Sequence, residues 1–494
     1  MGIPYYFYNL TRKYKNIIIN DIPKDISIYA IDFNGIIHPQ ASKETNEPLL
    51  FINLWNKIIS YKDTFNPSNI LICVDGVAPI AKIIQQRKRR YLSIFKNKID
   101  KISYKWDTNA ISAGTSFMNN LDEFIFKKIN ETSNKNSFIF DGSKNEGEGE
   151  HKIFQYLRTM DFDKTKGIII NGLDADLIIL SLLSKFDNIY LMRENNDETI
   201  YLSIDNLKKS LLNELKPLWI NLDDDEIIES YCVMCSILGN DFIPNIISLN
   251  MKNGGLIRII DLTTKAIKSN GSLVSQGKIN KDCLNEIFNQ ISLTEDTDLF
   301  NEVSTIIQKK PRDFTLESQE YGLKNKDSLL KDIYGNNKKW RYYYYKGLFD
   351  ININYDTSMI SIVVDSYIKG IYWTYNYYKG FDLNYEWFYP YNYSPTAKDI
   401  FNFLKVNDIG LIEKNGTFLN PKIQLLLILP IQSNHLLDDN LKHLTTDFKK
   451  GFKHLFPTEF KIQTFLKHHL HDCQPILPII DIDEIRKINN MIRP

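Results

Sequence analysis

The 494-residue sequence has little cysteine, no excess charge of either sign and no long apolar run. Five cysteines in so long a chain exclude a disulfide framework and indicate a reducing compartment. Sixty Lys and Arg residues balance sixty Asp and Glu residues, which excludes a generally basic nucleic-acid coat. The most apolar stretch, 425–431, is far too short to span a bilayer, and the N-terminus does not read as a signal peptide. We therefore expect a soluble, intracellular protein without a membrane partner.

A single CxxC motif, Cys232 and Cys235, lies inside the apolar run 231–238. A structural zinc site built from such a pair needs further ligands, and the sequence has no second CxxC. We interpret the two cysteines as buried thiols of the core.

The sequence is rich in apolar residues, with 43% hydrophobic and 13% aromatic residues, enough for a sizeable core. From residue 28 to about 250, expected strands (27–33, 69–74, 167–171, 188–192) alternate with expected helices (79–98, 114–130, 149–160, 174–184). This alternation predicts an α/β fold with a mainly parallel sheet flanked by helices. We expect three parts: 1–260, a polar connecting segment at 261–335, and a second, mostly helical region at 336–494.

Acidic residues recur at the expected carboxyl ends of the strands, where open parallel sheets bind their ligands. The set is Asp32, Asp75, Glu148, Glu150, Asp174, Asp176 and Asp241. Any one of them could be an ordinary helix cap. Seven converging carboxylates, however, would repel one another strongly in a low dielectric.

Divalent cations would remove that repulsion. Oxygen ligands without a His/Cys cluster favour Mg²⁺ or Mn²⁺ over Zn²⁺. Two ions roughly 3.5–4 Å apart suit in-line hydrolysis of a phosphodiester. We therefore predict that the seven carboxylates are the metal-binding and catalytic set, and that they hold two ions.

The segment after Asp75 predicts a basic helix, because Pro79 suits a first helical turn. Four donors fall on one face at i, i+4, i+7 and i+8: Lys82, Gln86, Arg89 and Arg90. Planar Arg groups and the point charge of Lys match phosphate oxygens, so we predict that the stripe binds a terminal phosphate. A solvated helix face or a nuclear-import signal in RKRR is the alternative.

Three aromatic residues are candidates for stacking on a base. His38 follows the Asp32 turn, beside the predicted metal site, although a locally satisfied histidine is the alternative. Trp373 and Trp387 lie in a second aromatic-rich region, where core packing is the alternative for each. We expect most rings of the run 341–346 to pack.

Together these residues resemble the Xrn family of 5′→3′ exoribonucleases. The matching strings, in the family's order, are MGIPYYF, IDFNGIIH, DGVAPIAKIIQQRKRR, ISAGTSFM, GEGEHKI, GLDADLIIL, LGNDFIP, IKGIYWTYNYYKG and WFYPYNYSP. They cover most of residues 1–260 and 340–430. GEGEHK, GLDAD and LGNDF in this order are highly specific.

The resemblance implies a PIN/FEN-like nuclease core over 1–260 and the family's second conserved region over 336–494. It implies Mg²⁺-dependent, stepwise degradation of decapped single-stranded RNA with a 5′-monophosphate, releasing nucleoside 5′-monophosphates in RNA decay. The seven carboxylates match the family's metal-binding set, and the four donors of the basic helix match its 5′-monophosphate pocket. His38 matches its base-stacking histidine, and Trp373, in preference to Trp387, would complete the stack.

Three features depart from the family pattern. Ile80 stands where the family usually has Arg, and Asn245 replaces a usual His. The chain also ends soon after the second region, so we expect a compact member. We also expect a monomer that is located in the cytoplasm. A nuclear location stays open, as does a viral factory or virion for a viral source. Two other activities stay open: a nuclease of DNA flaps or 5′ ends, and a catalytically inactive RNA-binding scaffold.

Overall fold

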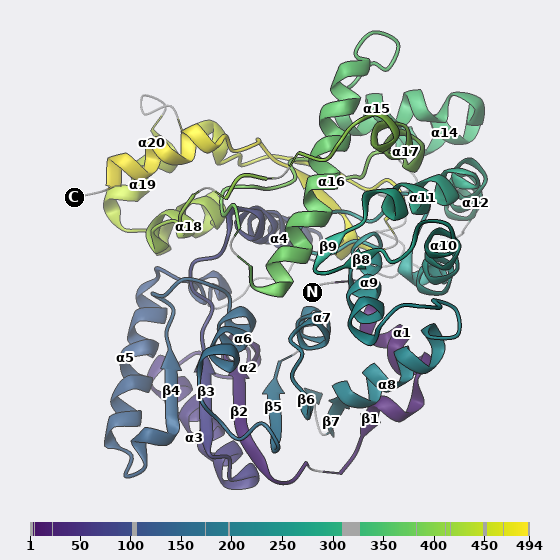
Figure 1. Cartoon of the computed structure of the whole chain (residues 1–494). Coiled ribbons are helices and arrows are strands. Elements are labelled where there is room, and N and C mark those ends of the chain that lie inside the picture. The colour runs from purple at the N-terminus through teal and green to yellow at the C-terminus, as the bar shows by residue number, and fades with distance from the viewer. Residues whose placement is uncertain are drawn as a thin grey trace.

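A central sheet of seven strands organises the N-terminal part of the chain (Figure 1). In spatial order the strands are β1 (Ile18–Ile19), β7 (Glu198–Ser203), β6 (Ile189–Asn195), β5 (Gly167–Asn171), β2 (Ile26–Asp32), β3 (Asn69–Cys73) and β4 (Phe138–Asp141). The five strands from β6 to β4 run parallel, and β7 and β1 add an antiparallel edge. This computed structural model describes residues 1–494 except 1–2, 4, 22, 101–105, 173, 196–197, 309–326, 382, 411, 415, 448–451, 468 and 493–494.

Helices cover both faces of the sheet because its central strands are apolar on both sides. Every residue of β2 is buried; Ile28 and Ala30 pack into one core, whereas Tyr29 and Ile31 pack into the other. The second core includes α2 (Asn34–Ala41), α3 (Glu47–Phe65) and α5 (Ser116–Glu131). The first includes α1 (Tyr6–Lys13), α6 (Gly149–Thr159), α7 (Asp176–Leu183), α8 (Ile204–Leu215) and α9 (Asp224–Ser236). The predicted α/β class with a mainly parallel sheet is confirmed.

Three of the seven strands were absent from the sequence prediction. β1 has two residues, β4 has four, and β7 begins with exposed residues, so none of the three carries the buried apolar run that marks the other strands. The predicted helices correspond to α4 (Ile80–Asp100), α5, α6 and α7, with ends shifted by a few residues.

The rest of the chain is mostly helical, as predicted. Its elements are α10 (Gly255–Asn270), β8 (Val274–Ser275), β9 (Lys278–Ile279), α11 (Lys281–Ser292), α12 (Glu295–Gln308), α14 (Ser328–Gly335), α15 (Trp340–Phe349), α16 (Thr357–Lys379), α17 (Ala397–Val406), α18 (Pro421–Ile428), α19 (Asp439–Thr446), β10 (Lys461–Gln463), β11 (Gln474–Ile476) and α20 (Ile482–Ile492).

The segment 261–335, expected to be a polar connection, is mainly helical where the structure describes it, with a short hairpin and brief turns between the helices. α10 runs through the boundary expected at residue 260, and Ile267 and Phe288 join the first core. Amphipathic helices with polar outer faces explain the misleading composition. The division of the chain into three parts remains a prediction.

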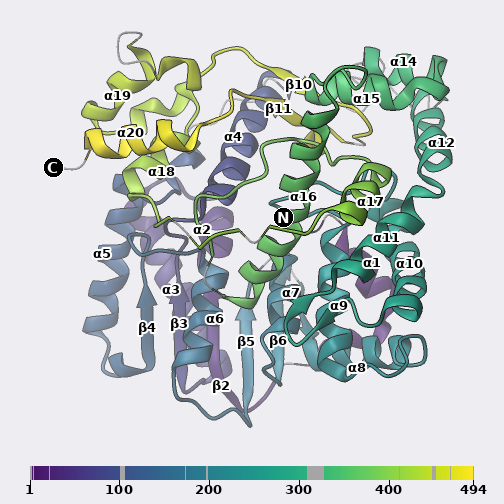
Figure 2. The ribbon, with the colours of Figure 1, turned by 45° about the horizontal axis from the view of Figure 1, so that its top comes forward.

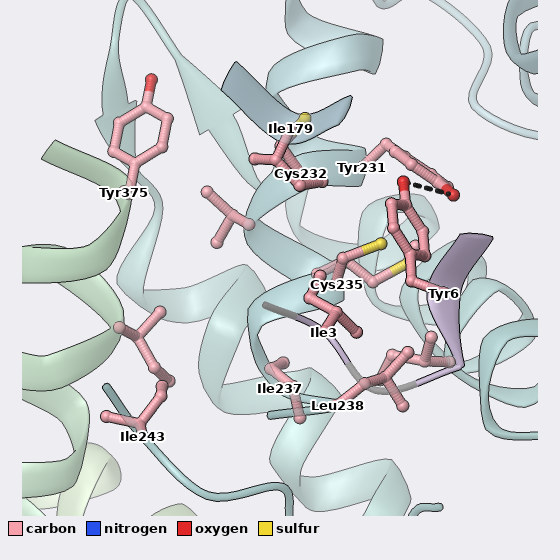
Figure 3. Close-up of a cluster of buried hydrophobic side chains, with 14 of the residues drawn as sticks. Ile3, Tyr6, Ile179, Tyr231, Cys232, Cys235, Ile237, Leu238, Ile243 and Tyr375 are labelled. Carbon is pink, nitrogen blue, oxygen red and sulfur yellow. Dashed lines mark hydrogen bonds between the residues drawn. The ribbon is translucent and has the colours of Figure 1, made fainter. Parts of the chain in front are cut away.

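The CxxC cysteines are core residues, as predicted. Figure 3 shows Cys232 and Cys235 among apolar side chains, with the Tyr6 hydroxyl donating a hydrogen bond to the Tyr231 hydroxyl at 3.1 Å. Both thiols are buried and free. Burial raises the pKa of Cys235 to about 12, so this sulfur stays protonated and unreactive.

Two long helices bring the second half of the chain onto the sheet. Figure 2 shows α16 descending between α6 and α7, and α18 beside α4, with which it is in contact. On α4, Arg87 is buried and donates hydrogen bonds to the carbonyls of Leu427 and Leu455. Among the described residues, no helix is long and apolar enough to cross a membrane.

Candidate active site

Three of the predicted carboxylates meet at the carboxyl edge of the sheet. Asp32 ends β2, Asp75 follows β3, and Glu150 lies in the first turn of α6. One oxygen from each lies within 4.8 Å of the others. These segments are far apart in the sequence, and they meet because the carboxyl ends of neighbouring parallel strands share one edge.

Lys82 of α4 joins two further carboxylates to this cluster. Its Nζ lies 2.6 Å from Glu148 Oε1 and 2.9 Å from Asp241 Oδ2, and all three side chains are at most 7% exposed. Asp176, in the first turn of α7, is close enough for the charges of Asp241 and Lys82 to act on it. Asp174 lies half-buried on the segment between β5 and α7.

The cluster carries more negative charge than its surroundings balance. Burial, followed by the charges of Asp75 and Glu148, raises the pKa of Asp32 to about 8. Burial and Glu148 also raise the pKa of Asp75 and, strongly, that of Glu150. A cation bound among carboxylates with raised pKa values would reduce the electrostatic repulsion between them.

Lys82 relieves part of the cluster. For Asp241, burial is the largest influence and raises the pKa, but the charge of Lys82, its hydrogen bond and the charges of further cationic groups together lower the pKa to about 2. Asp176 is not relieved to the same extent, because burial and then the charge of Asp241 raise its pKa to about 6. One internal cation therefore neutralises the Glu148–Asp241 side and leaves the Asp32–Asp75–Glu150 side acidic.

The cluster is compatible with a divalent cation. Among the described residues, Asp32 Oδ1 and Asp176 Oδ1 are buried carboxylate oxygens without a hydrogen-bond partner. Hard oxygen donors of this kind are the ligands that Mg²⁺ and Mn²⁺ take. Because Gly149 has no side chain, it leaves space beside Asp32; a Cβ atom at this position would lie 2.8 Å from Asp32 Oδ1. Asp32, Asp75 and Glu150 are the residues best placed to hold such an ion.

Backbone contacts fix the orientation of Asp75. The Gly149 N–H donates to Asp75 Oδ1 at 2.7 Å, and the Asp75 N–H donates to Asn34 Oδ1 at 3.1 Å. The loop that follows is held by Gln424 of α18, which accepts from the Ala78 N–H and donates to the Gly76 carbonyl. The helical region thus stabilises the loop between Asp75 and the basic helix.

Three residues that contact this site were missed by the sequence reasoning. The Tyr377 hydroxyl of α16 donates to Glu148 Oε2, and burial together with the charge of Asp176 raises the pKa of Tyr378. Lys152 donates to the carbonyls of Val74 and Gly142. The two tyrosines lie in an aromatic run that also suits plain core packing, so the sequence carried no specific signal for them.

The basic stripe of α4 has a buried and an exposed end. Lys82 and Gln86 are buried, Arg89 is exposed, and Arg90 donates to Ser112 Oγ at 2.6 Å. His38 of α2 lies at the exposed end. His38 is exposed, yet desolvation by the surrounding protein, followed by the charges of Arg89 and Arg90, lowers its pKa to about 4.

The prediction that Trp373 stacks on a base is wrong. Trp373 is 1% exposed, and its Nε1–H donates to the Asn384 carbonyl at 2.8 Å. Its ring stacks on Tyr377 at 5.0 Å and contacts Trp387 at 5.3 Å, so no face is open to a ligand. Its neighbours in the sequence could not show which ring of this region faces solvent; Trp387 is half-buried.

The two residues that depart from the family pattern have local structural roles. Ile80 is buried in a core shared with α18, and its N–H donates to the Tyr385 carbonyl. Asn245 donates from Nδ2 to the carbonyls of Ile246 and Leu249, which fixes the turn after Asp241.

Known families and proteins match this chain along its length. A family model described as the XRN 5′-3′ exonuclease N-terminus matches residues 1–195, and one described as the Xrn1 helical domain matches residues 221–335 and 324–492. The 5′-3′ exoribonuclease 2 of Gallus gallus is 23% identical, with 100% of this chain and 70% of that protein covered. The 5′-3′ exoribonuclease 1 of Homo sapiens is 25% identical, with 97% and 33% covered.

A further relative, the 5′-3′ exoribonuclease 1 of Saccharomyces cerevisiae, is 31% identical over 60% of this chain and 23% of its own length. Among solved structures, the catalytic core of Rad2 in complex with DNA has a TM-score of 0.32 and 15% identity, covering 67% of this chain and 85% of that chain. A similarity at that score bears on neither substrate nor mechanism. The two family models together span six of the seven strands of the sheet, the acidic cluster and the helical region, and the chain therefore belongs to the Xrn family of 5′→3′ exoribonucleases.

Proposed function

We propose that this protein is a Mg²⁺-dependent 5′→3′ exoribonuclease that degrades decapped, 5′-monophosphorylated single-stranded RNA to nucleoside 5′-monophosphates. The observation that carries the proposal is the meeting of Asp32, Asp75 and Glu150 within 4.8 Å, beside a basic helix that enters the same site through Lys82. Mn²⁺ has the same preference for oxygen ligands and is expected to support the reaction.

In this proposal the acidic residues hold the divalent cations at the carboxyl edge of the sheet. We assign this role to Asp32, Asp75, Glu148, Glu150, Asp174, Asp176 and Asp241. Two bound divalent ions would supply an activated water and charge stabilisation for the leaving oxygen. Lys82 and Tyr377 hold Glu148 in place, and the N–H of Gly149 orients Asp75.

In this proposal the basic stripe of α4 recognises the 5′ end of the RNA. Lys82, Gln86, Arg89 and Arg90 would bind one terminal phosphate, and this would set the distance from the 5′ end to the bond that is cut. His38 is uncharged at neutral pH because its pKa is lowered to about 4, so its ring is suited to stacking on a base beside Arg89 and Arg90.

We further propose that the protein acts as a monomer in the cytoplasm. The support for the location is its cysteines, since all five are buried and none forms a disulfide with another described residue, as in proteins of a reducing compartment.

Cleavage of four matched substrates tests the proposal. RNAs of one sequence with a 5′-monophosphate, a 5′-triphosphate or a 5′-hydroxyl, and the 5′-phosphorylated DNA, are incubated with the protein in Mg²⁺. We expect rapid release of mononucleotides from the 5′-monophosphorylated RNA alone. Equal rates on the three RNA ends would contradict the phosphate-pocket assignment, and faster cleavage of DNA would favour a DNA nuclease. Binding without cleavage would identify an inactive RNA-binding scaffold.

A further inference from the structure

A cavity of about 490 Å³ lies on a second face of α4, next to the acidic cluster. Its lining includes Asp241 and, from α4, Gln85, Lys88 and Arg89; the opposite wall comes from residues 388–389, 391–393, 465–467 and 471–475. Of the four donors of the predicted phosphate stripe, only Arg89 lines this cavity. Its volume lies in the range of small-molecule sites, roughly 300–1,000 Å³.

The α4 wall of the cavity carries unpaired positive charge. Burial alone lowers the pKa of Lys88 to about 8, and among the described residues Lys88 forms no ion pair. Across the cavity, the Lys467 ammonium lies over the Tyr393 ring at 5.1 Å, and desolvation lowers its pKa as well. Desolvated ammonium groups of this kind are stabilised by an anionic ligand.

The carboxylates that line the cavity are already engaged. Asp241 is paired with Lys82 at 2.9 Å. Asp472 accepts from the His469 N–H at 3.2 Å and lies 3.5 Å from His471 Nε2. Glu302 accepts from Asn250 at 3.5 Å. The Lys88 side of the cavity is therefore the side on which an anion would be held.

Two amide side chains that line the cavity have buried polar atoms without a hydrogen-bond partner among the described residues. These atoms are Gln85 Oε1 and Asn240 Nδ2. One is an acceptor and the other a donor, and unmet buried polar atoms are costly. Aromatic side chains, among them Phe388 and Tyr391, complete the wall. Aromatic faces with amide donors and acceptors are the surfaces that recognise an unpaired base.

We propose that this cavity is a second nucleotide subsite, in which Lys88 binds a phosphate while the base packs on the aromatic wall near Gln85 and Asn240. The proposal rests on the proposed function, because it takes the acidic cluster beside Asp241 as the place where nucleotides are released. The nucleotide has two sources: the free nucleoside 5′-monophosphate, or a further nucleotide of the bound strand.

Isothermal titration of the full chain in EDTA tests the subsite without cleavage. The ligands are adenosine 5′-monophosphate and 5′-phosphorylated hexa-adenylate. The variants are Lys88→Gln, Gln85→Leu and the matched control Lys96→Gln, which neutralises an exposed lysine of the same helix. Arg90→Gln marks binding to the predicted 5′-phosphate stripe. We expect Lys88→Gln to raise the Kd of one binding event about tenfold, because a desolvated charge-assisted contact is lost. This effect should add to that of Arg90→Gln. Gln85→Leu should weaken the same event without a change in charge.

The two ligands separate the two sources. A larger effect of Lys88→Gln on the mononucleotide assigns the cavity to the released product, and a larger effect on the hexamer assigns it to the strand. Equal binding of both ligands by wild type, Lys88→Gln and Gln85→Leu overturns the subsite. The binding measurement needs no metal, so Lys88-dependent binding in EDTA by a chain that fails to degrade RNA in Mg²⁺ would overturn the proposed function and leave the subsite standing.

Discussion

The hydroxyl of Tyr377, near the end of α16, donates a hydrogen bond to Oε2 of Glu148, which precedes α6 by one residue and lies 229 positions earlier in the chain. The other oxygen of Glu148 is paired with Lys82. One carboxylate of the acidic cluster is thus held by the basic helix on one side and by the helical region on the other. The helical region is part of the site and not only a support for it.

Removal of this hydroxyl tests whether it matters for catalysis. We expect Tyr377→Phe to slow RNA degradation about tenfold, because a buried carboxylate oxygen that loses its donor costs about 1–3 kcal/mol. Tyr372→Phe is the matched control, since this hydroxyl lies on the same helix and reaches only the Ile279 carbonyl at 3.5 Å. Single-turnover rates at several Mg²⁺ concentrations measure the effect. Equal rates for the two variants would show that Tyr377 serves packing alone.

Lys82 is expected to act as an internal cation of the metal-free protein. Lys82→Met leaves Glu148 and Asp241 buried without their partner, so the free energy of unfolding in EDTA should fall by about 3 kcal/mol. Added Mg²⁺ should restore part of this loss by neutralising the same carboxylates. Urea denaturation of Lys82→Met and of Lys96→Met, with and without Mg²⁺, measures it. A loss of the same size in both variants would contradict this role.

Stability without metal should fall as the pH rises. The pKa of Asp32 is raised by burial and its acidic neighbours from 3.8 to about 8, and that of Asp176 to about 6. The folded state therefore binds more protons than the unfolded state between about pH 4 and pH 8. Ionisation of each such carboxyl group lowers the free energy of unfolding as the pH rises through this window. We expect the Tm in EDTA to decrease from pH 5.5 to pH 8, and the stabilisation by Mg²⁺ to grow over the same range. In Asp32→Asn the decrease should be smaller; an unchanged slope would show that the cluster does not titrate as described.

His38 and Trp373 should respond differently to truncation. His38→Ala removes an exposed ring and with it one stacking contact to a base. We therefore expect the KM for RNA to increase about tenfold, with little change in Tm. Trp373→Ala empties a fully buried position and should cost about 3–5 kcal/mol of stability. Thermal unfolding and steady-state kinetics separate the two effects. A stable Trp373→Ala with a raised KM would revive Trp373 as a ligand of RNA.

Much of the site could be predicted because its residues follow strands. Asp32 and Asp75 come directly after apolar runs that read as parallel strands, and parallel strands place their carboxyl ends together. The phosphate stripe was predicted from helical spacing, but spacing could not show that Lys82 points into the acidic cluster while Arg89 is exposed. That difference depends on how α4 packs against α18 and the sheet.

The contribution of the second half was the least predictable part. Tyr377, Tyr378 and Trp373 lie within six residues of one α-helix, and all three read as core aromatics. Burial confirms that reading for Trp373, whereas Tyr377 reaches Glu148 through its hydroxyl. Only the position of α16 against α6 and α7 decides between the two outcomes, and this position is set by contacts far apart in the sequence. β4 was missed for a similar reason, since its four residues pair with β3 only in the assembled sheet.

The central claim, that the carboxylates at the sheet edge cut RNA from its 5′ end, is tested most directly by one time course. A 5′-monophosphorylated RNA with a 3′ label is incubated with wild type and with Asp75→Asn in Mg²⁺, and both released mononucleotides and bound RNA are measured. The account predicts that wild type releases mononucleotides stepwise from the 5′ end, and that Asp75→Asn binds RNA but is about 100-fold slower, because a ligand that is oriented by Gly149 is lost. Degradation by Asp75→Asn at the wild-type rate would contradict it.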